Sequence, residues 1–407
     1  MKVINGGVTA AKGFKAASCA ANIKYEGRTD MAMVCSDTPC ECAGTFTSNV
    51  VKAACVMWDK EITESGRPMQ AVVINSGIAN ACTGKEGYDA CIATARAVEE
   101  GTGIPYDTVA VASTGVIGMQ LPVEKLTAGV RKMVPVLGET AEAGTDASRA
   151  IMTTDTVNKE AAVTFEIGTK TVTLGGMSKG SGMIHPNMCT MLAFLTTDAS
   201  IDKALMQKAL SEVVKDTFNM ISVDGDTSTN DTLLLMANGE AGNERIVSVG
   251  EGYAAFKEAL FYVCKTLAVK MAKDGEGASK LFTARVVNAS DKEEARTLAR
   301  SVISSSLSKA AIFGCDANFG RFLCAMGYSG VDFDQNSVEL FFESAAGKLQ
   351  VFKMGVPLDF DEDAALKILK EDEVTVLIDM HEGKEEATAW GCDLTYDYVK
   401  INADYRS

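Results

Sequence analysis

The chain has 407 residues, of which 47% are hydrophobic and 23% are charged. This length is too great for one small hydrophobic core, and the composition excludes an intrinsically disordered chain. The formal net charge of −15 excludes a general nucleic-acid-binding surface, because a polyanion is repelled on average and no dense Lys/Arg cluster offsets the repulsion.

Strand and helix patterns alternate through the first half of the chain. The β-branched run at 71–77 ends in a turn and predicts a strand, and residues 87–103 have the spacing of an amphipathic helix that a glycine ends. A second strand is predicted at 108–118, before a turn of small residues. Residues 170–176 alternate with period two and predict a third strand.

Two helices in the second half begin with polar caps. Residues 200–220 start at Ser200 and place apolar side chains on one face, namely Ala204, Leu205, Ala209 and Leu210. Residues 290–307 open with a capping box of Ser290 and Glu293, and their apolar positions follow helical spacing at Ala295, Leu298, Ala299, Val302 and Ile303.

The alternation predicts a mixed α/β protein in which sheets and helices pack in layers. Residues 361–380 read as a helix that runs into a strand, and the region from about 281 to 385 has a strand–helix–strand rhythm. We therefore expect a smaller C-terminal α/β lobe at 281–385.

The numbers and spacing of cysteines and histidines restrict the cellular compartment and the metal sites that the chain can have. The twelve cysteines are spread along the chain without a C-x-x-C pair, and only two histidines are present. This pattern favours reduced thiols over a disulfide framework, and it predicts no metal site. The N-terminal residues 1–27 lack the apolar core of a signal peptide, and no run reaches the roughly 18 apolar residues of a membrane helix. We expect a cytoplasmic protein that binds neither membrane nor nucleic acid.

The stretch "GGMSKGSGMIHPNMCTMLAFLTTD", residues 175–198, places Thr190 between a glycine-rich segment and an apolar strand. A threonine becomes a nucleophile without histidine when it is the first residue of a chain, because its own α-amino group, with a pKa of about 7.7–8.0, acts as the base. The preceding glycines supply backbone freedom for attack of the Thr190 hydroxyl on the Cys189 carbonyl. From the residues alone, an ordinary threonine at the start of a strand remains the simpler interpretation.

Other motifs give weaker signals. Ser178 stands in the G-x-S-x-G pattern of a serine-hydrolase elbow, but such an elbow needs a following helix and "GSGMIHPNM" is not helical in pattern. A serine hydrolase that uses Ser178 and a non-catalytic protein that binds amino acids remain the alternatives to a threonine nucleophile.

The segment "KGSGMIHPNMCTML" resembles the self-cleavage segment of the glutamate N-acetyltransferase family, also called ornithine acetyltransferases, which are self-processing N-terminal-threonine enzymes of arginine biosynthesis. The resemblance covers essentially the whole chain. Further blocks that resemble the family are "GTFTSNVVKAA" (44–54), "NSGIANACTG" (75–84), "ASTGVIGMQLP" (112–122), "FNMISVDGDTSTNDT" (218–232), "KDGEGASK" (273–280), "AIFGCDANFGR" (311–321) and "AWGCDLTYDYVKINADYRS" (389–407).

The resemblance implies a layered αββα sandwich of the N-terminal-nucleophile type. It implies cleavage between Cys189 and Thr190 into an α chain, residues 1–189, and a β chain, residues 190–407, which assemble as two α and two β chains. The implied reaction is a ping-pong transfer of acetyl from N-acetylornithine to glutamate through Thr190, without a cofactor. Whether acetyl-CoA is also an acetyl donor stays open.

The resemblance also assigns site residues by position. Thr114 and Gly115 match the oxyanion hole, whose donors must face the oxygen that becomes negative. The positions that match substrate-binding residues are Thr153, Lys179, Thr190, Glu276, Asn402 and Ser407. Cys189 stands where the family usually has alanine, and we expect cleavage to persist because a thiol is only slightly larger.

Overall fold

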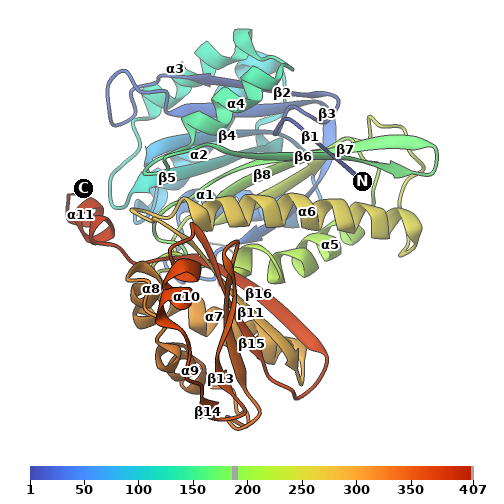
Figure 1. Ribbon diagram of the computed structural model, residues 1–407. Helices are drawn as coiled ribbons and strands as arrows, with labels where there is room; N and C mark the ends of the chain where they lie inside the picture. The colour runs from blue at the N-terminus through green and yellow to red at the C-terminus, as the bar shows by residue number, and fades with distance from the viewer. Residues whose placement is uncertain (186–190, 405–407) are drawn as a thin grey trace.

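The computed structural model describes residues 1–185 and 191–404. Within these residues the strands form one sheet of nine strands and one of seven, and helices pack against both (Figure 1). The nine-stranded sheet runs in the order β1-β6-β7-β8-β10-β3-β4-β5, and β2 pairs with β3. Its strands are β1 (Lys2–Ile4), β2 (Phe14–Cys19), β3 (Met31–Phe46), β4 (Met69–Ile78), β5 (Val109–Val116), β6 (Lys159–Ile167), β7 (Lys170–Lys179), β8 (Leu192–Thr197) and β10 (Thr232–Ala237).

The seven-stranded sheet belongs mainly to the C-terminal third of the chain and forms the smaller lobe at the bottom of Figure 1. Its order is β14-β13-β12-β15-β11-β16-β9. Its strands are β9 (Ile221–Ser222), β11 (Leu281–Ala289), β12 (Glu339–Ser344), β13 (Gly347–Lys353), β14 (Val356–Pro357), β15 (Glu373–Asp379) and β16 (Glu385–Cys392).

Helices cover the sheets. α6 lies across the junction of the two lobes and packs on β6 and β7, with α5 beside it (Figure 1). The described helices are α1 (Ala54–Glu64), α2 (Gly84–Thr102), α3 (Val123–Met133), α4 (Ala141–Ala150), α5 (Lys203–Lys215), α6 (Glu251–Lys273), α7 (Lys292–Ser304), α8 (Ser306–Phe313), α9 (Phe319–Gly327), α10 (Glu362–Leu369) and α11 (Tyr396–Asp404). The 3₁₀ helices are η1 (Tyr106–Thr108), η2 (Val134–Val136) and η3 (Phe218–Met220). Even α6, with 23 residues, lacks the apolar length that a bilayer crossing requires, and the same holds for every other described helix.

The side chains of β8 alternate between two hydrophobic cores. Ala193 and Leu195 pack in the core that includes α5, α6 and the C-terminal lobe. Phe194, between them, packs in the other core with the N-terminal strands. Because successive strand residues point to opposite faces, a strand buried on both faces is apolar throughout, as "LAFL" is. The predicted layered α/β architecture with a smaller C-terminal lobe is confirmed.

Most predicted elements form where the periodicity places them. The strand predicted at 71–77 lies in β4, the strand at 108–118 contains β5, and the strand at 170–176 lies in β7. The helix predicted at 87–103 corresponds to α2, which begins three residues earlier and ends at Thr102. Gly103 caps it in the left-handed conformation, with φ of 78°. The apolar face predicted for 290–307 is buried in α7.

Two predicted helix caps are wrong by one or two residues. α5 is capped by Asp202, whose side chain accepts from the backbone N–H of Ala204, and not by Ser200. α7 is capped by Asp291, whereas the Ser290 hydroxyl bonds the Glu294 carboxylate. In both cases an aspartate follows the serine and fills the same role, because both residue types are strong N-caps. Ala204, which was predicted on the apolar face, is exposed on α5.

Candidate active site

A cavity of about 150 Å³ lies where β5 and β7 end and where β8 and β10 begin. Six residues that the family resemblance assigned to oxyanion stabilisation or substrate binding line it: Thr114, Gly115, Thr153, Lys179, Glu276 and Asn402. The predicted residues Cys189, Thr190 and Ser407 lie outside the described residues. Met191, which follows Thr190 in the chain, also lines the cavity.

Gly115 occupies a position that only glycine fits. Its φ is +132°, and a Cβ atom built there would lie 2.2 Å from the carbonyl carbon of Gly77 on the neighbouring strand. The two glycines pair in the parallel ladder of β4 and β5, so the two backbones meet without intervening side chains. The absence of a side chain leaves the backbone of Thr114 and Gly115 at the cavity wall.

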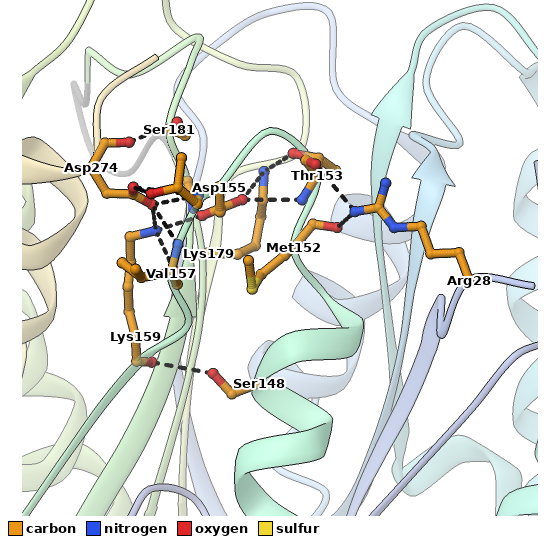
Figure 2. Close-up of polar contacts among 12 residues, drawn as sticks. Arg28, Ser148, Met152, Thr153, Asp155, Val157, Lys159, Lys179, Ser181 and Asp274 are labelled. Atoms are coloured by element: carbon orange, nitrogen blue, oxygen red, sulfur yellow. Dashed lines mark hydrogen bonds and ion pairs between the residues drawn. The ribbon is translucent and has the colours of Figure 1, made fainter. Parts of the chain in front are cut away.

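Lys179 is buried at the end of β7, and its ammonium group lies beside Thr153 and Asp155 (Figure 2). The Nζ atom donates to Thr153 Oγ1 at 2.8 Å and lies 3.8 Å from Asp155 Oδ2. Burial lowers the pKa of Lys179, and the charge of Asp155 opposes this effect. These contacts leave donor capacity on the ammonium group for an anion in the cavity, since lysine carries three N–H donors.

Lys179 contacts a buried network of ion pairs through Asp155 (Figure 2). The fully buried Lys159 ammonium group bonds Asp155 Oδ1 at 2.7 Å and Asp274 Oδ2 at 2.6 Å. Burial by itself would raise the pKa of Asp155, but the charges of Lys179 and Lys159, with hydrogen bonds from Lys159 and the Gly180 N–H, lower it to about 2. Asp155 is therefore ionised at neutral pH and holds a negative charge next to Lys179.

The Glu276 carboxylate forms another wall of the cavity. Its Oε2 atom accepts from Asn402 Nδ2 at 2.8 Å, so α11 is tied to the site. The Glu276 backbone N–H donates to the Ser181 carbonyl at 2.9 Å. Gly182 lies against the carboxylate, and a Cβ atom built there would be 2.3 Å from it. The glycine-rich segment before the predicted cleavage point thus packs on Glu276, one of the predicted substrate-binding residues.

Asp231 lines the same cavity and did not stand out in the sequence. It lies just before β10, is 1% exposed, and its Oδ2 atom has no hydrogen-bond partner in the described part of the chain. Burial raises the pKa of Asp231 well above its ordinary value, although hydrogen bonds from Thr47, Ser228 and the Met191 backbone oppose the rise.

Asn230, the preceding residue, connects the strands that carry the site. Its Nδ2 atom donates to the carbonyl of Ser113 at 2.9 Å and also bonds the carbonyl of Ala79. Ser113 precedes Thr114 on β5, so this amide fixes the end of β5 relative to the start of β10. The family resemblance covered the block that contains Asn230 and Asp231, but no periodicity or charge pattern marks these two residues as site residues.

Ser178 does not occupy a nucleophile elbow. It lies inside β7, pairs with Lys159 on one side and Ala193 on the other, and is buried. An elbow requires a sharp turn from a strand into a helix, and the residues that follow Ser178 continue β7 and then form the wall at 180–184. The serine-hydrolase alternative therefore lacks its structural requirement.

The described residues contain no group of three or more His, Cys, Asp or Glu side chains placed to hold a metal ion. Of the two histidines, His381 is exposed in a turn and His185 is half-buried with its Nδ1 atom 3.1 Å from the Ser222 hydroxyl. The cavity is lined by hydroxyl, carboxylate, amide and ammonium groups.

A model of the ArgJ family matches residues 15–407. The chain is 52% identical over 409 residues to the arginine biosynthesis bifunctional protein ArgJ of Symbiobacterium thermophilum, and the alignment covers 100% of both chains. It is 49% identical over 411 residues to the arginine biosynthesis bifunctional protein ArgJ 1 of Clostridium acetobutylicum, covering 100% of this chain and 99% of the relative. Among solved structures, the Mycobacterium tuberculosis ornithine acetyltransferase complexed with ornithine is 43% identical, covers 46% of this chain and 98% of that chain, and has a TM-score of 0.42.

Proposed function

The chain belongs to the ArgJ family and is an acetyltransferase of arginine biosynthesis that acts on small molecules, and on this premise we propose that it transfers the acetyl group of N2-acetyl-L-ornithine to L-glutamate. The acetyl group is carried by Thr190 after cleavage between Cys189 and Thr190. Residues 1–189 are then the α chain and residues 190–407 the β chain.

The reaction proceeds in two matched halves. The Thr190 hydroxyl, deprotonated by the α-amino group of the same residue, attacks the acetyl carbonyl carbon of acetylornithine. The bond between the acetyl carbon and nitrogen breaks, the amine takes the proton, and ornithine leaves. The glutamate amine then attacks the acetyl-Thr190 ester, so that N-acetylglutamate forms and the threonine hydroxyl recovers its proton.

The cavity residues suit this substrate class. Thr114 and Gly115 donate to the oxygen that becomes negative in each tetrahedral intermediate. Lys179 pairs with a substrate carboxylate and Glu276 with a substrate ammonium group, because charge-assisted hydrogen bonds fix both ends of an amino acid. Thr153 holds the Lys179 ammonium group at 2.8 Å, and Asn402 holds the Glu276 carboxylate. We assign Ser407 to the same substrate site.

One observation carries the proposal. Six predicted site residues, which are spread from position 114 to position 402, converge on a single cavity that Met191 also lines. The cavity therefore adjoins the residue that follows the proposed nucleophile. Its small volume and its paired cationic and anionic walls fit an acetylated amino acid.

Denaturing gel electrophoresis and N-terminal sequencing of the purified protein test the proposal. We expect two fragments in place of one band of about 43 kDa, with the second fragment beginning at Thr190. Thr190→Ala should give an uncut and inactive chain. Thr171→Ala, on the exposed start of β7, is the matched control and should be cut and active.

Mass spectrometry after mixing with acetylornithine then locates the acetyl group. An acetyl group on Thr190 supports the proposal, whereas an active enzyme with one intact chain contradicts it. A protein that binds amino acids without forming any acetyl-enzyme would be the non-catalytic alternative.

We propose that acetyl-CoA is a second acetyl donor, because both full-length relatives are named bifunctional. Acetyl-CoA is then a substrate, and no cofactor is required. Glutamate acetylation assayed with acetyl-CoA as sole donor tests this point, and no product above the Thr190→Ala background would contradict it.

For the assembled enzyme we propose two α and two β chains in the cytoplasm. The cysteines fit this setting, because all eleven that the structure describes are free thiols. Size measurement of the cleaved protein by light scattering tests the assembly, and a mass equal to one α and one β chain would contradict it.

A further inference from the structure

We propose that the Asp231 carboxylate binds a primary ammonium group in the acetyl-transfer cavity, which makes Asp231 an additional site residue of the proposed reaction. The inference rests on the proposed function, because that function requires amines to enter, leave and act as a base in this cavity. Among the assigned residues that the structure describes, Glu276 is the only carboxylate, and it packs on Gly182.

The burial of Asp231 argues for a missing partner. Its Oδ2 atom is buried and has no hydrogen-bond partner within the described residues, yet the side chain lines the cavity. Buried polar atoms are nearly always hydrogen-bonded, because an unpaired one carries a desolvation penalty. Because Asp231 lines the cavity, its carboxylate is placed to accept a hydrogen bond from a donor that arrives with the reaction.

Strand register places Asp231 beside the start of β8. Thr232 pairs with Leu192 in the parallel ladder, and the Thr232 N–H donates to the Met191 carbonyl at 2.8 Å. Asp231 is therefore adjacent to Met191, the residue covalently bonded to Thr190.

The charges around Asp231 fit a cation. Lys179 lies close enough to lower the pKa of Asp231, but the buried Asp155 shares the Lys179 charge. Glu276 stands on the other wall of the cavity. An arriving ammonium group would compensate Asp231 directly and favour its ionised form, since a nearby opposite charge stabilises a carboxylate.

The ammonium group has two possible sources. One is the α-amino group that cleavage before Thr190 releases, and the other is the amino group of ornithine or glutamate. The chemistry is the same, because each is a primary amine that gains or loses a proton as the acetyl group moves. In either case the hydrogen bond holds the nitrogen in place and raises its pKa.

The test compares Asp231→Asn with Asp59→Asn. Asp59 is a matched control, because it is also fully buried and one of its carboxylate oxygens has no hydrogen-bond partner among the described residues, but it lies on α1 and does not line the cavity. Formation of the acetyl-enzyme is followed by mass spectrometry with two donors, acetylornithine and p-nitrophenyl acetate, which carries no amine. The rate is measured as a function of pH.

We expect D231N to be cut and to form the acetyl-enzyme about 10- to 100-fold more slowly, because it loses one hydrogen bond to a charged group. D59N should react like the wild type. A loss with both donors, together with a rising limb of the pH profile that moves to lower pH, identifies the released α-amine as the partner. A loss with acetylornithine alone identifies the substrate amine.

Other outcomes overturn the inference. Equal rates in D231N, D59N and wild type with both donors show that no amine depends on Asp231. If D231N folds but stays uncut while D59N is cut, then Asp231 acts in the cleavage itself, before the reaction has released an amine. If D231N does not fold, Asp231→Ala is used in the same comparison. Equal loss of folding in D59N and D231A then shows that Asp231 is needed only as a buried residue and not to bind an amine.

The failure of this inference is distinguishable from failure of the proposed function. A wild-type enzyme that is never cut, or that carries the acetyl group elsewhere than on Thr190, contradicts the proposed function. A wild-type enzyme that behaves as proposed beside an unchanged D231N contradicts only the role of Asp231.

Discussion

Replacement of Lys159 by methionine tests whether the buried ion network supports the site. Lys159 lies in β6 with its side chain completely buried, and its ammonium group bonds Asp155, Asp274 and the Val157 carbonyl. Methionine fills a similar volume but carries no charge. The substitution therefore leaves two buried carboxylates without their shared cation.

The magnitude follows from this geometry. Removal of one partner from a buried ion pair typically costs about 3–5 kcal/mol, because an uncompensated charge stays buried. We expect the free energy of unfolding of K159M to fall by about this amount. Asp155 also loses one of its two cationic partners, so its carboxylate is no longer held beside Lys179 from both sides. We therefore expect the KM for acetylornithine to rise by roughly 10-fold, the equivalent of about 1.4 kcal/mol.

Urea unfolding measures the stability change, and steady-state kinetics at neutral pH measure the KM. Lys170→Met is the matched control, because Lys170 is exposed at the start of β7 in the same hairpin and its replacement should change stability by no more than about 0.5 kcal/mol. A K159M protein that unfolds within about 1 kcal/mol of K170M would refute the reasoning, since the ion network would then contribute no more than a surface lysine.

Two further predictions concern neighbouring groups. The pKa of Asp155 is lowered from 3.8 to about 2, so its contribution of about 2 kcal/mol is present above pH 4 and is lost as the pH falls from about 4 to 2. The difference in urea midpoint between wild type and Asp155→Asn should therefore narrow over that window, and a constant difference would contradict the assignment. Gly115→Ala places a Cβ atom 2.2 Å from Gly77 and should lower acetyl transfer by at least about 100-fold. Gly118→Ala, with φ of +86° and open space around it, should cost only about 1 kcal/mol of stability and retain activity.

The periodic elements were predictable because local residue patterns dictate them. β4, β5, β7 and α7 lie where alternation or helical spacing places them. The helix caps at Asp202 and Asp291 were missed because a serine stood one or two positions before each aspartate, and both side chains cap well. Local pattern thus predicts that a helix begins, but competition between neighbouring polar residues decides at which position.

Charged residues of the site were less predictable. Without the family resemblance, Lys179 and Glu276 read as solvated surface charges, yet Lys179 is 7% exposed and Glu276 is half-buried against Gly182. No sequence pattern marked Lys159 as a buried residue, although its side chain is completely buried. Its burial depends on Asp274, which lies 115 residues away in the sequence.

The sequence by itself determined the alternating strands and helices, the acidic surface charge and the motif blocks, because these follow from the order of residues over short distances. Only the tertiary structure decided which charges share one cavity. The ends of β5 and β7 meet the starts of β8 and β10 there. Burial is a property of the packed chain, so the ionisation of Asp155 and the unpartnered oxygen of Asp231 exist only once distant segments have come together.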